Sequence, residues 1–150
     1  MVRNEFQWSC WSIFCDDTVT GLLYKEMLVE YVWPKLKRKK FYFQHDGAGA
    51  HYAIAVREWL DENFSNQWTG RRGAFDWPAR SPDLTPCDFF HWDYLKDIMF
   101  KKPPATIMEL QQSIEEACEQ VTEEMCRKAC RSVTQRFRDC LNCEGYFLSY

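Results

Sequence analysis

FYFQHDGAGAHYAIAVREWL, residues 41–60, predicts a short apolar strand followed by a small-residue turn and a helix. The strand is expected over 41–45, where three aromatic residues stand together, and the helix over 50–64, which contains few helix breakers. Asp46 lies between the two. A loop carboxylate is ordinarily a turn cap, but at the carboxyl end of a strand it can also bind a metal ion. The residues alone leave both interpretations open.

Composition limits the class of protein. The chain has 150 residues, of which 46% are hydrophobic and 17% aromatic, enough for the core of one domain. No stretch reaches the roughly 18 consecutive apolar residues of a membrane helix, and the first residues lack the apolar block of a signal peptide. We therefore expect a soluble intracellular protein with no membrane partner.

The eight cysteines are expected to be reduced thiols, because their spacing is irregular and no secretory signal accompanies them. Cys140 and Cys143 form one C-x-x-C pair. No second pair is spaced to complete a tetrahedral zinc site, so we expect no zinc.

The net charge of −3 argues against nucleic-acid binding over the whole surface, because phosphate binding needs clustered lysines and arginines. Such clusters do occur, in LKRKK (36–40), in GRRG (70–73), in FKK (100–102), and in RKACR with RFR between 127 and 138. Each cluster alone is ordinarily a solvated surface, but their number keeps DNA binding open. The candidate nucleic-acid-binding residues are Lys37, Arg38, Lys39, Lys40, Arg71, Arg72 and Arg80.

Strands and helices are expected to alternate in the first half of the chain. A short strand is predicted over 10–15, and a helix over 20–32 with Thr20 as its N-cap and Pro34 preventing its continuation. The Gly- and Pro-rich segment 67–88 is predicted to be a long loop with at most one short strand, at its start.

The second half of the chain is expected to be helical. One helix starts at Cys87 and stops before Pro103. A capping box of Thr106 and Glu109 opens the next helix, and Thr122 opens the last, each ahead of apolar residues at helical spacing. A helical half thus follows a strand-bearing half within one domain.

Asp88 is the second informative acid, because it opens a helix whose apolar stripe contains Trp92, Leu95 and Met99. A carboxylate along such a stripe must cap the helix, accept hydrogen bonds or be neutralised by a cation, since burying it unpaired is costly. Capping is the ordinary explanation. A pair of acids, one after a strand and one at a helix start, is also what magnesium-dependent phosphoryl transfer needs. Asp46 and Asp88 are therefore the candidate catalytic and metal-binding residues.

QHDGAGAH (44–51), followed by WPARSPDLTPCDFFHWDYLKD (77–97), resembles the C-terminal part of the catalytic domain of mariner-type transposases, which are DDE/D-superfamily endonucleases. The resemblance implies an α/β, partial ribonuclease-H-like fold over 1–150, with a short mixed sheet flanked by helices. It implies three acids that hold two Mg²⁺ or Mn²⁺ ions for cleavage and joining of DNA strands. Asp46 resembles the second of these acids and Asp88 the third. DNA in the nucleus is the implied partner, and a homodimer the implied assembly.

The chain also departs from the family pattern. The first catalytic Asp of the family lies upstream of the segment where the resemblance begins, so we expect a truncated core that lacks it and lacks the N-terminal DNA-binding domain. Asp16 and Asp17 precede a helix and are expected to be turn residues, as is Asp83 after its proline. Gly49 replaces a proline of the family motif. With one acid missing, positioning of the reacting oxygens is lost, so the chain should bind DNA weakly, without sequence preference, and be inactive alone.

Two alternatives stay open at this point. The chain could be a domesticated or relic module that binds protein or nucleic acid without metal. It could instead be an active nuclease whose third acid is Asp16, Asp17 or Asp76. A third carboxylate close to Asp46 and Asp88 would favour the nuclease.

Overall fold

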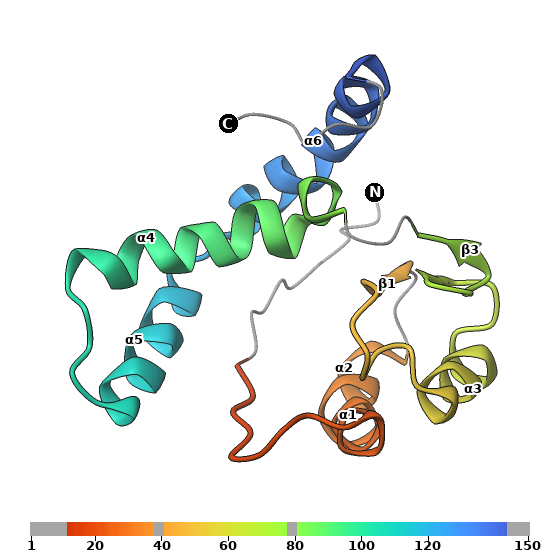
Figure 1. The fold of residues 1–150 in the computed structure, drawn as a ribbon, viewed down its shortest axis with the longest axis horizontal. Helices are drawn as coiled ribbons and strands as arrows, with labels where there is room; N and C mark the ends of the chain where they lie inside the picture. Colours follow the sequence, from red (N-terminus) through yellow and green to blue (C-terminus); the bar gives the residue numbers. More distant parts are fainter. Residues whose placement is uncertain (1–11, 38–40, 78–80, 144–150) are drawn as a thin grey trace, which may run out of the picture. The chain divides into compact units, whose positions relative to one another are not determined.

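The computed structural model of the chain describes residues 12–37, 41–77 and 81–143 (Figure 1). The chain divides into two compact units, each considered by itself. We call them the sheet unit, Cys15–Ser81, and the helical unit, Met1–Phe14 with Pro82–Tyr150. None of the helices in the described ranges is long and apolar enough to cross a membrane.

A continuous helical stretch opens the sheet unit, and it runs further than predicted. It consists of α1 (Gly21–Met27), a π-helical turn η1 (Leu28–Val32) and α2 (Trp33–Leu36). Thr20 caps α1 as predicted, since its Oγ1 accepts a hydrogen bond from Leu23 N at 3.3 Å. The prediction that Pro34 prevents continuation is wrong. Pro34 stands in the first turn of α2, directly after η1. The wider π-helical turn interrupts the α-helical hydrogen bonding at the place where the proline ring would otherwise block it.

The strand predicted over 10–15 is absent from its described part. Residues 12–15 have no regular secondary structure, and 10 and 11 lie outside the described residues. Ile13 and Phe14 are exposed, at 40% and 39%. Apolar content alone does not make a strand, because a strand also needs a neighbour to satisfy its backbone hydrogen bonds.

Three short strands form a sheet in the order β1–β2–β3. They are β1 (Phe43–Gln44), β2 (Trp68–Gly70) and β3 (Phe75–Asp76). Both pairings are parallel, where a mixed sheet was expected; Phe43 pairs with Trp68, and Thr69 pairs with Phe75. The sequence predicted β1, over a longer range, and β2, but not β3. Parallel strands usually need a connection of a dozen or more residues, and β2 and β3 are joined by a tight loop instead.

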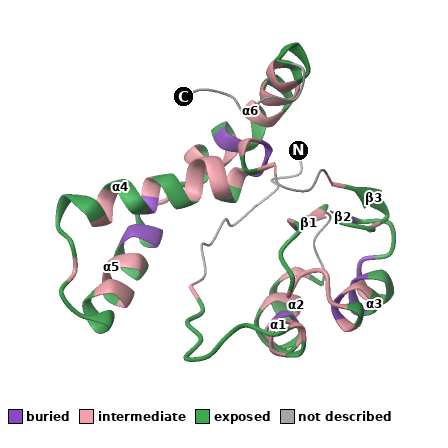
Figure 2. Cartoon of the chain, viewed as in Figure 1, coloured by how far each residue is buried: buried purple, intermediate pink, exposed green. Residues whose placement is uncertain are grey.

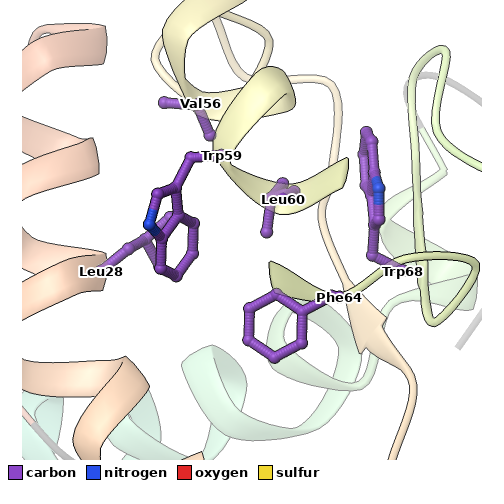
Figure 3. Packing of buried hydrophobic residues seen from close by; sticks show 6 residues of the cluster. All are labelled: Leu28, Val56, Trp59, Leu60, Phe64 and Trp68. Atoms are coloured by element: carbon purple, nitrogen blue, oxygen red, sulfur yellow. The ribbon is translucent and has the colours of Figure 1, made fainter. Parts of the chain in front are cut away.

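α3 (Ile54–Asn63) supplies most of the core of the sheet unit. It begins later than predicted because a turn precedes it, with Tyr52 N donating to Ala48 O at 3.0 Å. Its buried residues pack against α1, η1 and β2 (Figure 3). The buried cluster comprises Leu28, Val56, Trp59, Leu60, Phe64 and Trp68. Trp68 Nε1 donates to Asp61 Oδ1 at 2.9 Å, so the indole keeps a polar partner at the edge of this core.

The helical unit contains the three helices that the sequence predicted. Its elements are the 3₁₀ turn η2 (Pro82–Leu84), the π-helical turn η3 (Cys87–Trp92), α4 (Asp93–Lys101), α5 (Ile107–Glu119) and α6 (Glu123–Asn142). Both predicted threonine caps are confirmed. Thr106 Oγ1 accepts from Glu109 N at 3.1 Å, and Thr122 Oγ1 accepts from Met125 N at 3.3 Å. Glu109 reaches back to Ala105 N at 2.8 Å, one residue before the partner expected in a capping box.

The core of the helical unit lies between α4 and α5 (Figure 2). Leu95, Ala117 and Cys118 are buried there, and Met99 packs against them. Trp92, which the sequence placed on the same stripe as Leu95, is 48% exposed. The reason is the π-helical turn η3, whose wider period takes Trp92 out of the α-helical spacing. The seven cysteines within the described ranges are free thiols, and Cys10 lies outside those ranges.

Candidate functional site

Asp46 follows β1 and closes the turn that leads into α3. Its Oδ1 accepts a hydrogen bond from Ala48 N at 2.9 Å and lies 2.5 Å from His51 Nδ1. The turn-cap interpretation of Asp46 is therefore confirmed. Both contacts use Oδ1, and Oδ2 has no hydrogen-bond partner among the described residues. With a side chain 44% exposed, Asp46 keeps one carboxylate oxygen available to a ligand.

Asp46 is held in its charged form. Partial burial acts to raise its pKa, but the hydrogen bonds from Ala48 N and His51, with the electrostatic attraction of His51 and of His45 in its protonated form, outweigh burial and lower the pKa below its usual value. Asp46 is consequently an ionised carboxylate at neutral pH. An anionic oxygen is the ligand that hard divalent cations prefer.

His45 lies beneath this turn as a neutral, buried support. It is 4% exposed, and its Nε2 lies 2.8 Å from Tyr24 Oη. Burial, followed by the charge of His51, lowers the pKa of His45 from 6.5 to about 3, against the opposing effect of Asp46. The rings of His45 and His51 stack with centroids 4.7 Å apart, and Tyr24 packs on His51 at 4.4 Å. These contacts fix the ring that holds Asp46.

Sequence reasoning did not single out Tyr24, His45 or His51. The two histidines stand within the stretch that was quoted for Asp46, at one residue before and five after it. That spacing across a small-residue turn is the one signal that could have indicated them. Tyr24 carries no such signal, because only folding brings α1 to this turn.

Asp88 lies in the first turn of η3, in the helical unit. A carboxylate there is favoured by the positive end of the helix dipole. The N-cap position belongs to Pro86, so Asp88 does not cap the helix by that position, and its own N donates to Thr85 O at 2.8 Å. Asp88 also lines an open cavity of about 370 Å³, together with Asp83, Asp93 and other residues of η2, η3 and α4.

Arg136 of α6 holds the turn that precedes Asp88. Its guanidinium carbon lies 3.8 Å from the centroid of the Phe89 ring, and its Nη1 donates to Asp83 O at 3.2 Å. The prediction that Asp83 belongs to a turn is confirmed by its place in η2. Arg136 therefore positions the residues on both sides of Asp88.

The structure places the two candidate acids in different units, Asp46 in the sheet unit and Asp88 in the helical unit. The resemblance implies that both acids hold the same metal ions, and that they approach one another stays a prediction. Within residues 12–37, 41–77 and 81–143, no group of three or more His, Cys, Asp or Glu side chains is arranged to hold a metal ion. Asp16 and Asp17 form a bend before α1, and Asp76 Oδ1 accepts from Arg72 N at 3.0 Å.

The basic candidates are only partly described. Lys37 is exposed at the end of α2, and Arg71 and Arg72 are exposed in the connection between β2 and β3. The remaining candidates lie outside the described residues: Arg38, Lys39, Lys40 and Arg80.

Comparison with curated proteins found similarity to a transposase. Over 115 residues the chain is 30% identical to the transposable element Tc3 transposase of Caenorhabditis elegans, covering 75% of this chain. The chain spans 32% of that relative's length. No protein-family model matches the chain.

Solved structures share the fold. The Mos1 transposase catalytic domain, in a structure with raltegravir and Mg, matches with a TM-score of 0.72 at 19% identity, covering 89% of this chain and 67% of that one. The Mos1 mariner paired-end complex with Mn also matches with a TM-score of 0.72 at 19% identity, over 89% of this chain and 39% of that one. The mixed α/β architecture with its small parallel sheet is thus the fold of a segment of that catalytic domain.

Proposed function

Because the chain is homologous to the catalytic domain of Tc1/mariner transposases, we propose that it is a nucleic-acid-binding segment of a DDE/D catalytic core in which Asp46 and Asp88 bind Mg²⁺ or Mn²⁺. The observation that carries the proposal is the state of Asp46. It is an ionised carboxylate in the turn that follows β1, fixed through Oδ1 and open at Oδ2.

The donor set fits a hard divalent cation. Asp46 offers a fixed anionic oxygen, and Asp88 lines an open cavity at the start of a helix held by Arg136. Bound metal ions would polarise the attacking and leaving oxygens of a phosphodiester. The chain's own residues orient the ligands: His51 and Ala48 N fix Asp46, and the stacked His45 supports His51.

The proposed function needs both units of the chain. We propose that the sheet unit and the helical unit together form one partial ribonuclease-H-like domain, which brings Asp46 and Asp88 to the same ions. DNA is the proposed partner, bound weakly and without sequence preference by this segment, and we propose a homodimer acting in the nucleus. The solved Mos1 structures support the proposed DNA partner and metal ions, since they include a paired-end complex with Mn and a catalytic domain with Mg.

Metal binding tests the proposal directly. Titration of the metal-free chain with Mn²⁺, followed by electron paramagnetic resonance of the free ion, should show saturable binding. Asp46→Asn and Asp88→Asn should each weaken that binding at least tenfold, because each removes an anionic ligand. Asp83→Asn is the matched control on the same cavity, and it should bind Mn²⁺ as the unmodified chain does.

The outcomes separate the candidate functions. Equal Mn²⁺ binding by all four proteins, or no saturable binding at all, would contradict the metal site and favour the metal-independent interaction module. Loss of Mn²⁺ binding in Asp46→Asn but not in Asp88→Asn would mean that Asp88 does not share the site.

A further inference from the structure

Three arginine side chains converge on the ring of Tyr52, in the turn before α3. The guanidinium carbons of Arg71, Arg57 and Arg72 lie 4.4, 4.9 and 5.9 Å from the ring centroid. Arg57 comes from α3, whereas Arg71 and Arg72 come from the loop between β2 and β3. Like charges repel, so a convergence of this kind needs an aromatic ring, an anion or both to offset the repulsion.

The three guanidinium groups make no ion pair with a carboxylate in the part of the chain that the structure describes. Other arginines of the chain do. Arg127 pairs with Glu123, and Arg131 Nη1 lies 3.7 Å from Glu124 Oε1. The positive charge around Tyr52 is therefore concentrated and available to an external anion, in a chain whose net charge is −3.

The backbone holds the cluster in place. Arg57 Nε donates to Tyr52 O at 3.2 Å, which links the first turn of α3 to the backbone of Tyr52. Arg72 N donates to Asp76 Oδ1 at 3.0 Å, and Thr69 Oγ1 donates to Phe75 O at 2.9 Å, so the loop that carries Arg71 and Arg72 is closed at both ends. Guanidinium groups that are already positioned lose less entropy when they bind a ligand.

We propose that Tyr52, Arg57, Arg71 and Arg72, the arginine cluster, bind successive phosphates of a nucleic-acid strand. This inference rests on the proposed function. Tyr52 directly follows His51, whose Nδ1 contacts Asp46 Oδ1, so the cluster and the carboxylate belong to one turn. A strand held by the cluster is thereby brought to the proposed metal ligand. Planar guanidinium groups suit phosphate oxygens because they donate two parallel hydrogen bonds.

The test is the salt dependence of DNA binding. A fluorescein-labelled duplex is titrated with the 150-residue chain and with Arg71→Gln/Arg72→Gln, and the dissociation constant is measured by anisotropy between about 50 and 200 mM KCl. Because each phosphate contact contributes about 0.9 to the slope of log K against log salt, the double variant should lose about 1 to 2 units of slope. Its affinity should fall roughly tenfold at low salt.

The matched control changes the same charge elsewhere. Arg127→Gln/Arg131→Gln removes two ion-paired arginines from α6 and should leave the slope unchanged. Tyr52→Leu keeps every charge but removes the ring, so affinity should fall while the slope stays within a few tenths of a unit. If Arg71→Gln/Arg72→Gln fails to fold by circular dichroism, Arg57→Gln replaces it, with an expected loss of about one unit of slope.

The outcomes distinguish this inference from the proposed function. If the slope of log K against log salt is unchanged in the folded arginine variants, the arginine cluster does not bind phosphates. An equal loss of slope in the α6 control, Arg127→Gln/Arg131→Gln, would contradict the proposal in the same way. Poly-glutamate that binds the cluster as tightly as DNA does at equal charge would make it a docking site for acidic protein, and would overturn the nucleic-acid assignment. Mn²⁺ binding is measured on the same variants. If it is intact in Arg71→Gln/Arg72→Gln and lost in Asp46→Asn, the metal site stands whatever the cluster does.

Discussion

At the scale of the residue, the turn after β1 shows how one carboxylate is held in a fixed position. Oδ1 of Asp46 contacts both Ala48 N and His51 Nδ1, and Oδ2 remains available to a ligand. His45 is buried below it in the neutral form, and its Nδ1 has no hydrogen-bond partner among the described residues. A neutral ring suits this position, because a charged imidazole would be costly to bury.

The burial of His45 predicts an acid-sensitive fold. Its pKa falls from 6.5 to about 3 on folding. Between pH 6.5 and about pH 3, His45 is therefore protonated in the unfolded chain and neutral in the folded chain. The free energy of unfolding should therefore be highest above pH 6.5 and fall as pH drops towards 3, by at most about 1.4 kcal/mol per pH unit.

Urea denaturation of the metal-free chain at about pH 7 and about pH 5 measures this slope. In His45→Gln this part of the slope should disappear, because glutamine does not titrate. Tyr24→Phe is the control, since it removes the hydroxyl beside Nε2 but keeps the histidine. A slope that persists unchanged in His45→Gln would show that other groups carry the acid sensitivity.

At the scale of the element, the packing of α1 on α3 depends on a missing side chain. A Cβ atom on Gly21 would lie 2.2 Å from the Cβ of Ala53, immediately before α3, which is far inside van der Waals contact. The Cβ of Ala53 is bonded directly to the backbone, so it is not the end of a flexible side chain that could move aside. The first residue of α1 must therefore be glycine for the two helices to approach as they do.

Gly21→Ala should destabilise the sheet unit by about 1 to 3 kcal/mol, the usual effect of overpacking a close contact. Gly49→Ala is the matched control, because no atom beyond its two chain neighbours lies within 4 Å of the position its Cβ would take. That variant should change the free energy of unfolding by less than about 0.5 kcal/mol. Chemical denaturation of both variants checks the prediction, and equal stability of the two would mean that α1 does not pack on Ala53 in solution.

At the scale of the whole molecule, the proposed function assigns Asp46 and Asp88 to one metal centre. They belong to different units, so metal binding and the association of the units are linked in the proposed function. A ligand that binds only the associated form stabilises it by mass action.

We expect the 150-residue chain by itself not to nick supercoiled plasmid in Mg²⁺ or Mn²⁺, because two acids leave the reacting oxygens poorly positioned. Agarose-gel assays of the purified chain measure this. Metal-dependent nicking that disappears in both Asp46→Ala and Asp88→Ala would show that a third ligand exists within the chain. Asp16, Asp17 and Asp76 would then be the residues to substitute next.

What the sequence determined by itself is local. The caps at Thr20, Thr106 and Thr122 follow from neighbouring residues in the chain, since each hydroxyl bonds a backbone N–H three residues away. The position of Asp46 after a strand follows in the same way, and so does the end of α4 before Pro103.

Only the tertiary structure decided the rest, because those features join residues that lie far apart in the chain. Burial of His45 depends on Tyr24 of α1, and the arginine cluster forms only when the β2–β3 loop reaches Tyr52. The sequence did not predict β3, because β3 pairs in parallel with β2 across a loop much shorter than the dozen or more residues that usually connect parallel strands. Continuation of the helix through Pro34, and the exposure of Trp92, depend on π-helical turns that residue spacing does not reveal. Charge, burial and convergence of side chains are properties of the folded neighbourhood, whereas capping and strand ends are properties of adjacent residues.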